Sequence, residues 1–219
     1  MSHEHLVPPG VDPNDAALLQ RAYALRDQDE GQVLYTEWAE TYDRTMVDGL
    51  GYISPQRLVD VFTRHVTWRD GAVLDLGCGT GLVGRDLHGR GFTTLDGLDL
   101  SEPMMSEAAR SGAYRRFVVG DLNATLPIET GSYAAMVCNG TFTSGHVGAG
   151  CLPEVLRLIE PGGFFACAVH NSVWDALGFS AEFADLTGRG VLEELDVIES
   201  PYYLSSPGPD GRLCVFRTT

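Results

Sequence analysis

The chain has 219 residues, 44% of them hydrophobic, and a formal net charge of -15 at pH 7. This length and apolar content suit one α/β domain with its own core. The acidic balance leaves few basic residues to neutralise phosphates, so we expect no nucleic-acid substrate. Apolar runs end before about 18 residues, and residues 1–10 lack the apolar core of a signal peptide, which predicts a cytoplasmic protein without membrane contact.

Cysteine and histidine spacing indicates neither a disulfide framework nor a metal centre. The cysteines are odd in number and form no C-x-x-C pair; they are Cys78, Cys138, Cys151, Cys167 and Cys214. We therefore expect reduced, buried thiols. His3 and His5 have a spacing that metal ligands use, but no third ligand is in view, so no metal is predicted.

Three helices are predicted ahead of the first strand. Asp12 and Pro13 can cap a helix over residues 14–26. Apolar and aromatic residues recur at intervals of three and four within residues 32–48, which predicts a second helix with one buried face. Ser54 and Pro55 begin a third helix that runs to about His65. This part of the chain reads as a helical lid.

The rest of the chain alternates between strand and helix patterns. Strands are predicted at 72–76, 93–98, 115–119, 133–138 and 163–169, with helices at 82–88, 102–110, 151–159 and 174–186. Such β-α-β repetition is typical of a parallel sheet. Residues 192–203 and 212–217 flank a Pro-Asp-Gly turn, which predicts a terminal antiparallel hairpin.

Residues 73–81, VLDLGCGTG, join a strand-like run to a glycine-rich turn that carries an acid. The glycines let the backbone approach a ligand closely at the start of a helix, which predicts a nucleoside cofactor. Residues 79–84 are literally G-x-G-x-x-G, and Asp99 follows about 20 residues on, so an NAD-dependent oxidoreductase is one alternative. Asp75, however, would repel a pyrophosphate, whereas it would attract the ammonium and sulfonium of S-adenosylmethionine (SAM).

Residues 73–81 resemble the first motif of class I SAM-dependent methyltransferases, and four later segments agree at the family's intervals: 97–101, 120–122, 138–140 and 160–164. The resemblance covers residues 35–170 well and the C-terminal fifty poorly. It implies a Rossmann-like α/β fold, with a seven-stranded, mostly parallel sheet, an antiparallel last strand and helices on both faces. Within one domain, 1–219, we expect an N-terminal helical lid (1–68), a cofactor-binding core (69–170) and a C-terminal substrate-side part (171–219).

The resemblance also implies roles for individual residues. Asp99 would bind both ribose hydroxyls, and Asp121 would receive the adenine amino group while Leu122 meets the ring. Asn139 and Gly140 would lie under the methionine portion, near Asp75 and the turn glycines. The predicted cofactor-binding residues are Tyr42, Asp75, Gly77, Gly79, Asp99, Leu100, Met104, Asp121, Leu122, Asn139 and Gly140.

Some of these assignments compete with simple core packing. Residues 35–43 resemble a Y-x-x-W-A-x-x-Y-D segment that precedes the first motif in small-molecule methyltransferases, where its aromatic residues close over the cofactor. Tyr42 and Trp38 are the candidates, although an aromatic stripe at helical spacing also suits a core. Leu100 and Met104 have the same two interpretations.

Methyl transfer needs mainly alignment, so a general base matters only for an acceptor that starts protonated. His146 follows the fourth predicted strand and should reach the sheet edge where substrates bind, which makes it the candidate catalytic base. The alternative is a loop histidine that bonds to backbone. His170, at the end of the fifth strand, is a weaker candidate.

The acceptor is constrained only loosely. Residues 139–142 read NGTF and lack the Asn/Asp-Pro-Pro-aromatic run of nucleic-acid base methyltransferases, while 145–147 resemble the methyltransferase-like proteins named after the Williams-Beuren region. Aromatic residues predicted to line an apolar pocket favour a small aromatic or polyketide-like acceptor; they are Tyr52, Phe142, Trp174, Phe179, Phe183 and Tyr203.

The predicted function is transfer of the SAM methyl group to an oxygen, nitrogen or carbon of a small molecule, leaving S-adenosylhomocysteine. One alternative is a SAM-binding cyclase or pericyclase that transfers no methyl group. The NAD-dependent oxidoreductase is less favoured. A monomer and a homodimer are equally compatible with the sequence.

Overall fold

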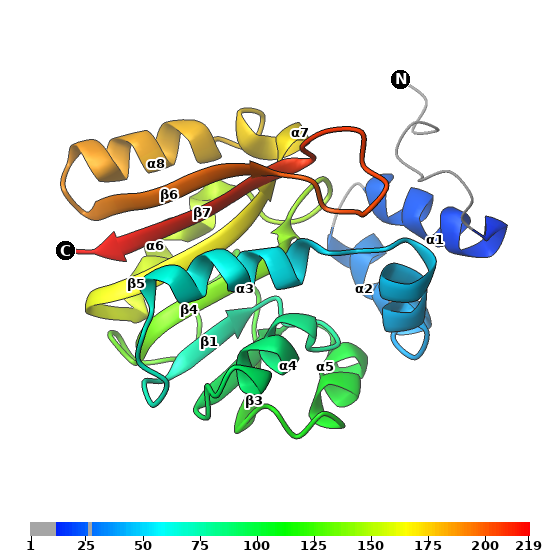
Figure 1. The fold of residues 1–219 in the computed structure, drawn as a ribbon, viewed down its shortest axis with the longest axis horizontal. Helices are drawn as coiled ribbons and strands as arrows, with labels where there is room; N and C mark the ends of the chain where they lie inside the picture. The colour runs from blue at the N-terminus through cyan, green and yellow to red at the C-terminus, as the bar shows by residue number, and fades with distance from the viewer. Residues whose placement is uncertain (1–11, 26–27) are drawn as a thin grey trace.

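The structure is a computed structural model that describes residues 12–25 and 28–219 (Figure 1). His3 and His5 lie outside the described residues. The helical elements are α1 (Pro13–Tyr23), α2 (Gln28–Trp38), the π-helix η2 (Arg44–Gly49), α3 (Ser54–His65), α4 (Leu82–Gly89), α5 (Glu102–Ala109), the 3₁₀-helix η3 (Ala149–Cys151), α6 (Leu152–Arg157), α7 (Asn171–Trp174) and α8 (Phe179–Gly188). The strands are β1 (Val73–Leu76), β2 (Leu95–Asp99), β3 (Arg116–Val119), β4 (Tyr133–Phe142), β5 (Ile159–His170), β6 (Leu192–Ser200) and β7 (Gly211–Thr218).

The seven strands form one sheet in the order β3-β2-β1-β4-β5-β7-β6. Pairing is parallel from β3 through β5, whereas β7 runs antiparallel to both β5 and β6. This arrangement confirms the predicted sheet and its antiparallel last strand. The motif strand β1 lies between β2 and β4 and is buried along its whole length, so the glycine turn after it opens at the middle of the sheet edge.

Helices cover both faces of the sheet, and each face has its own core. Leu58 and Phe62 of α3 pack in one cluster with Val73, while Leu152 of α6 packs in the other with Leu74. Because successive side chains of a strand point to opposite faces, β1 contributes to both clusters. All five cysteines are free and buried, as expected. Within the described part of the chain, no helix combines the length and apolarity needed to cross a bilayer.

Two predicted helices are each split in the structure. The predicted helix over residues 32–48 is wrong: α2 ends at Trp38, and η2 begins at Arg44. Between them, the Asp43 carboxylate accepts hydrogen bonds from the Thr80 hydroxyl and from the Arg85 guanidinium, contacts that join this segment to the turn after β1. The predicted helix over residues 174–186 is also interrupted: α7 ends at Trp174, and α8 begins only at Phe179, after Gly178 in a left-handed conformation (φ 81°).

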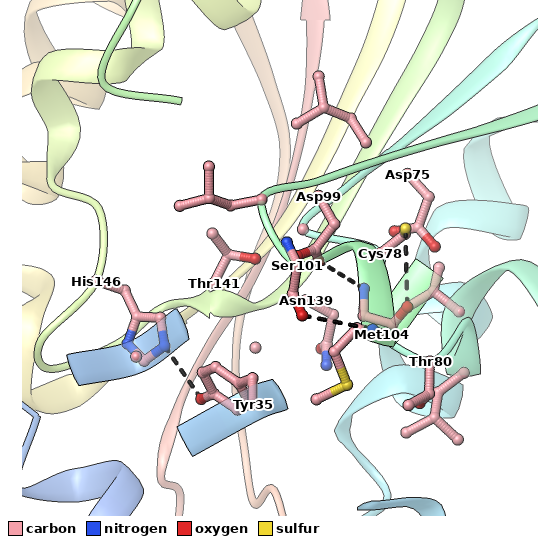
Figure 2. A pocket seen from close by; sticks show the side chains of 18 of the residues that line it. Tyr35, Asp75, Cys78, Thr80, Asp99, Ser101, Met104, Asn139, Thr141 and His146 are labelled. Atoms are coloured by element: carbon pink, nitrogen blue, oxygen red, sulfur yellow. Dashed lines mark hydrogen bonds between the residues drawn. The ribbon is translucent and has the colours of Figure 1, made fainter. Parts of the chain in front are cut away.

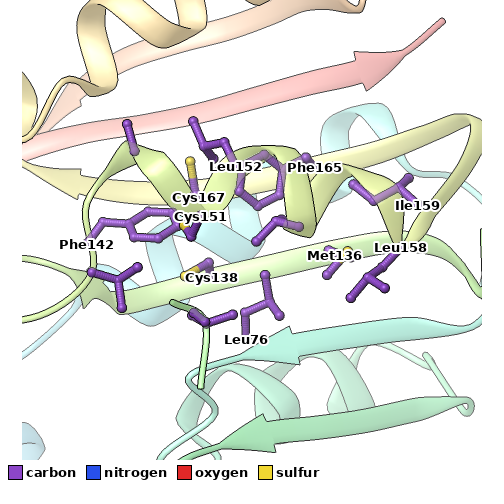
Figure 3. Close-up of a cluster of buried hydrophobic side chains, with 14 of the residues drawn as sticks. Leu76, Met136, Cys138, Phe142, Cys151, Leu152, Leu158, Ile159, Phe165 and Cys167 are labelled. Carbon is purple, nitrogen blue, oxygen red and sulfur yellow. The ribbon is translucent and has the colours of Figure 1, made fainter. Parts of the chain in front are cut away.

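The apolar pocket predicted from aromatic residues is wrong for four of its six members. Phe142, Phe179 and Phe183 are at most 4% exposed and belong to the core cluster on the α6 face. Figure 3 shows Phe142 within this cluster. Trp174 packs against that cluster, with the Arg212 guanidinium 4.7 Å from its ring centre. These rings fill the space between α8 and the sheet. Tyr52 and Tyr203 of the predicted set line the two cavities described below.

Candidate functional site

A cavity opens at the carboxyl ends of β1, β2 and β4 and encloses about 1060 Å³, open solvent included (Figure 2). Its lining contains every predicted site residue except one: Tyr42, Asp75, Gly77, Gly79, Asp99, Leu100, Met104, Leu122, Asn139, Gly140 and His146. Asp121 is not part of the lining. It sits between the lining residues Gly120 and Leu122, and its carboxylate accepts a hydrogen bond from the Asn123 amide at 2.8 Å.

The glycines after β1 shape the floor of this cavity. Gly77 has φ 64°, and a Cβ there would lie 2.0 Å from the Thr141 hydroxyl oxygen. Gly79 has φ 52°, and a Cβ there would meet no protein atom within 4 Å. The first position therefore needs glycine for both conformation and space, whereas the second leaves room for a ligand to approach the backbone.

Asp99, at the end of β2, is held by two backbone amides. One carboxylate oxygen accepts from Gly79 N and the other from Ser101 N, each at 2.8 Å (Figure 2 shows the Gly79 bond). Burial raises the pKa of Asp99, and these two amides oppose the rise. A carboxylate has about four acceptor positions, so lone pairs remain on both oxygens for a pair of ligand hydroxyls. This geometry suits a ribose.

Asp75 is 1% exposed and accepts a hydrogen bond from the Tyr114 hydroxyl at 2.6 Å. Burial raises the pKa of Asp75 to about 7, although the Tyr114 hydrogen bond lowers it. The Tyr114 ring lies against α4, where a Cβ on Gly84 would fall 2.2 Å from the phenol oxygen. The last glycine of the G-x-G-x-x-G pattern therefore makes room for a tyrosine that binds Asp75.

Asn139 is fixed by the start of α3. Its amide nitrogen donates to the Tyr52 hydroxyl at 2.8 Å, and its amide oxygen accepts from the Ser54 hydroxyl at 2.8 Å. Tyr52 in turn bridges to Tyr203 in the segment between β6 and β7. The end of β4 is thus tied both to the N-terminal helices and to the C-terminal part of the chain.

His146 lines the cavity and also bonds to backbone, and its role as a catalytic base stays a prediction. Its Nδ1 lies 2.9 Å from the Ser144 carbonyl oxygen, which can only accept, so Nδ1 carries the proton of the neutral ring. Its Nε2 then accepts from the Tyr35 hydroxyl at 3.1 Å (Figure 2). Burial lowers the pKa of His146, with the Ser144 carbonyl and the Asp99 charge opposing, so the ring is neutral near pH 7.

A second cavity adjoins the first. We call it the inner chamber; its lining residues are Leu19, Ala22, Tyr23, Tyr35, Trp38, Tyr42, Met46, Tyr52, Gly140, Thr143, His146, His170, Tyr202 and Tyr203. Tyr35, Tyr42, Tyr52, Gly140 and His146 line both cavities and so mark their junction. Trp38 lines only the inner chamber, and its ring centre lies 4.8 Å from that of Tyr42.

The charges that line the first cavity discriminate between the two candidate cofactors, SAM and a dinucleotide. Within the described residues, the first cavity is lined by the carboxylates of Asp75 and Asp99 and by no lysine or arginine. The nearby Arg85 guanidinium bonds to Asp43 and to the Thr80 carbonyl. A pyrophosphate would meet carboxylates without a cation, whereas a cationic ligand would be attracted. The residues present therefore fit SAM better than a dinucleotide.

Two of the contributors could not be recognised in the sequence. Tyr114 lies 39 residues from Asp75 and belongs to no motif. Tyr23 shares a hydrogen bond with Tyr203, 180 residues away, at 3.2 Å between hydroxyl oxygens. The sequence did point to Tyr35, because it is the first residue of the aromatic segment 35–43. Its hydrogen-bond partner His146 lies 111 residues further along the chain, so the pairing could not be predicted.

Comparisons with known proteins agree with this geometry. A family model described as "Methyltransferase domain" matches residues 73–163. Human methyltransferase-like protein 27 is 32% identical over 163 residues, 73% of this chain and 66% of the relative. The bovine 18S rRNA (guanine-N(7))-methyltransferase is 35% identical over 65 residues, 30% of this chain and 23% of the relative. The chain thus spans just under two thirds of the first relative's length and a much smaller share of the second's.

Among solved structures, a TehB-like SAM-dependent methyltransferase from Corynebacterium glutamicum superposes with a TM-score of 0.63 at 22% identity, covering 84% of this chain and 98% of that one. This likeness supports the fold. Together with the matched motif strand, the glycine turn and the paired carboxylates, these similarities lead to one conclusion: residues 73–163 are a methyltransferase domain in a chain with the class I methyltransferase fold, and the cofactor of such a domain is SAM.

Proposed function

We propose that this chain transfers the methyl group of SAM to an oxygen, nitrogen or carbon of a small-molecule acceptor. The observation that carries the proposal is the inner chamber, which adjoins the carboxylate-lined cavity at Gly140 and His146. An acceptor there would lie beside the methionine end of a cofactor placed as the family resemblance implies. Holding the two reactants in contact is the main requirement of such a transfer.

The chain offers a separate group to each part of the cofactor. Asp99 would hold the ribose hydroxyls, with Asp121 and Leu122 at the adenine and Leu100 and Met104 against its ring. Gly77, Gly79, Asn139 and Gly140 would surround the methionine portion, with Tyr42 closing over it and Asp75 attracting its charge. When bound, SAM supplies an electrophilic methyl group on a sulfonium. The residues of the chain align the acceptor and exclude water.

The proposed division of the domain follows from which parts of the chain line the inner chamber. The lid, residues 1–68, contributes Leu19, Tyr23 and Tyr35, and the C-terminal part, residues 171–219, contributes Tyr202 and Tyr203. The core, residues 69–170, supplies most of the lining of the cofactor cavity, and Tyr35, Tyr42 and Tyr52 of the lid add to it. This arrangement supports a lid and a substrate-side part around one site, in a protein that we place in the cytoplasm.

A nucleic-acid acceptor is the competing substrate class, since one relative is named for 18S rRNA. That relative matches 30% of this chain, and the chain's net charge of -15 opposes binding to phosphates. The aromatic lining of the chamber suits a small acceptor. Likeness of residues 145–147 further supports placing the chain with the methyltransferase-like proteins of the Williams-Beuren region.

The test is a mass-spectrometric screen of small molecules incubated with the full chain and SAM. The expected result is a product heavier by one methylene, together with S-adenosylhomocysteine. A product of altered connectivity with SAM left intact would instead establish the cyclase or pericyclase alternative. Methylation confined to added ribosomal RNA would overturn the small-molecule proposal.

A further inference from the structure

We propose that the inner chamber binds an uncharged phenol-type acceptor, and that Tyr35 relays the acceptor's proton to His146. The proposal rests on the function proposed above and adds the substrate class and a second catalytic residue.

The lining of the chamber argues for an uncharged ring. Seven aromatic rings other than histidine line the chamber: Tyr23, Tyr35, Trp38, Tyr42, Tyr52, Tyr202 and Tyr203. Within the described residues, no lysine, arginine, aspartate or glutamate lines it. A carboxylate or phosphate would be desolvated there without a counter-ion, which costs several kcal/mol. A planar ring, by contrast, packs favourably against aromatic side chains.

His170 adds a hydrogen-bond donor to the lining of the chamber. Nδ1 of His170 accepts from the Ser172 amide at 3.1 Å, because a backbone N–H can only donate. The other nitrogen, Nε2, therefore carries the proton of the neutral ring. Burial lowers the pKa of His170, and the Asp210 charge opposes this. His170 thus offers an N–H group to a polar atom of the acceptor without adding a net charge.

The hydrogen bond between Tyr35 of α2 and His146 of the loop after β4 defines the path of the acceptor's proton. Nε2 of His146 already accepts from the Tyr35 hydroxyl, so the acceptor cannot use that lone pair directly. The Tyr35 oxygen, having donated its proton, still has lone pairs for the acceptor hydroxyl. Tyr35 lines both cavities, which puts this oxygen at their junction. A phenol has a pKa of about 10 and is protonated at neutral pH, so its transfer needs such a base.

The step balances in atoms and charge. The acceptor O–H bond breaks as its oxygen forms a bond to the methyl carbon, and the bond between that carbon and sulfur breaks. The acceptor proton passes to the Tyr35 oxygen while the Tyr35 proton passes to Nε2 of His146. The positive charge that leaves sulfur ends on the imidazolium, which the Ser144 carbonyl and the Asp99 carboxylate stabilise.

The first test measures binding with three probes of matched shape. 4-Methylphenol, 4-methylbenzoate and 4-methylbenzylamine are titrated into the full chain saturated with S-adenosylhomocysteine, by calorimetry at pH 7. We expect the phenol to bind at least tenfold more tightly than either charged probe. Equal or tighter binding of the benzoate or the amine would overturn the uncharged class, as would no binding of the phenol.

The second test separates the relay from binding. Tyr35→Phe keeps the ring and removes the hydroxyl, and Thr36→Val is the matched control on the exposed side of the same helix. We expect Tyr35→Phe to slow methylation of 4-methylphenol at least tenfold at pH 7 with little change in KM, and to recover as pH approaches 10 and the phenol ionises. A rate equal to that of Thr36→Val, or no methylation by the parent chain at any pH, would overturn the relay.

Binding of S-adenosylhomocysteine serves as the folding control for both variants. If Tyr35→Phe loses that binding, His146→Gln gives the same test from the other end, because glutamine accepts a hydrogen bond but takes up no proton. Methylation of a charged acceptor would contradict this inference and leave the proposed function intact. If the parent chain does not bind S-adenosylhomocysteine, both this inference and the proposed function are contradicted.

Discussion

The cofactor cavity and the inner chamber are neighbours built in different ways. The cavity is formed by short segments at strand ends, with backbone amides and two buried carboxylates as its polar groups. The chamber is formed by side chains from elements as far apart as α1 and the segment between β6 and β7. Local segments thus produce a charged cofactor site, whereas tertiary packing produces a neutral chamber.

The cofactor cavity and the inner chamber also differ in the charge of their buried polar groups. Burial raises the pKa of both Asp75 and Asp99, which costs free energy when no cation is present. In the chamber, Tyr35 is instead paired with His146 and Tyr23 with Tyr203, whereas the buried Trp38 Nε1 and the Tyr202 hydroxyl have no hydrogen-bond partner. A protein maintains unfavourable carboxylates most readily where a cationic ligand compensates them.

Phe183→Ala sharpens the comparison most strongly, because this ring was predicted to line the pocket and lies in the core. It is 4% exposed and its ring centre is 4.5 Å from that of Phe216. We expect a loss of about 3–5 kcal/mol in the free energy of unfolding, measured by urea denaturation. The affinity of the folded protein for S-adenosylhomocysteine should not change. If the variant instead lost ligand affinity while keeping its stability, Phe183 would be part of the ligand site and not of the core.

Asp99→Ala should have the largest effect on the cofactor cavity. Removing two hydrogen bonds to a charged group, each worth about 1.5 kcal/mol, predicts roughly a 100-fold loss of S-adenosylhomocysteine affinity by calorimetry. Asp99→Asn should lose less, because it keeps an acceptor oxygen. Asp99→Ala binding within threefold of the parent chain would mean that this carboxylate does not hold the ribose.

Gly77→Ala tests the floor of the cofactor cavity. The added methyl group would clash with Thr141 at a backbone conformation that alanine adopts poorly, so we expect about 1–3 kcal/mol of lost stability. Gly89→Ala is the matched control, since a Cβ there meets nothing within 4 Å at the end of α4. It should be neutral or slightly stabilising in thermal unfolding. Equal stability of the two variants would show that the floor tolerates a side chain.

Asp75 gives the smallest effect, a pH dependence of cofactor affinity. Its pKa of about 7 means that the carboxyl holds its proton below that pH and attracts a ligand ammonium only above it. S-adenosylhomocysteine affinity should therefore rise by about fivefold from pH 6 to pH 7 and by about a further twofold to pH 8, and then level off. In Asp75→Asn this rise should be absent, as calorimetry across that range would show. An unchanged rise in the variant would assign it to another group.

The sequence predicted what short-range patterns encode. The alternation of strands and helices follows from local periodicity, and Asp75, Gly77 and Asp99 stand at strand ends that the pattern already located. The break after Trp38 was missed because the Asp43 contacts with Thr80 and Arg85 are long-range. Phe179 and Phe183 were misplaced because aromatic content alone does not say which face of a helix is buried. Tyr114 was missed because its role depends on the space above Gly84.

The central claim is that the cavity at the end of β1 binds a cation-bearing nucleoside rather than a dinucleotide. Calorimetric titration of the full chain with S-adenosylhomocysteine and, separately, with NAD tests it directly. We predict saturable binding of S-adenosylhomocysteine and no binding of NAD. Binding of NAD without binding of S-adenosylhomocysteine would contradict the account and restore the dinucleotide interpretation of G-x-G-x-x-G.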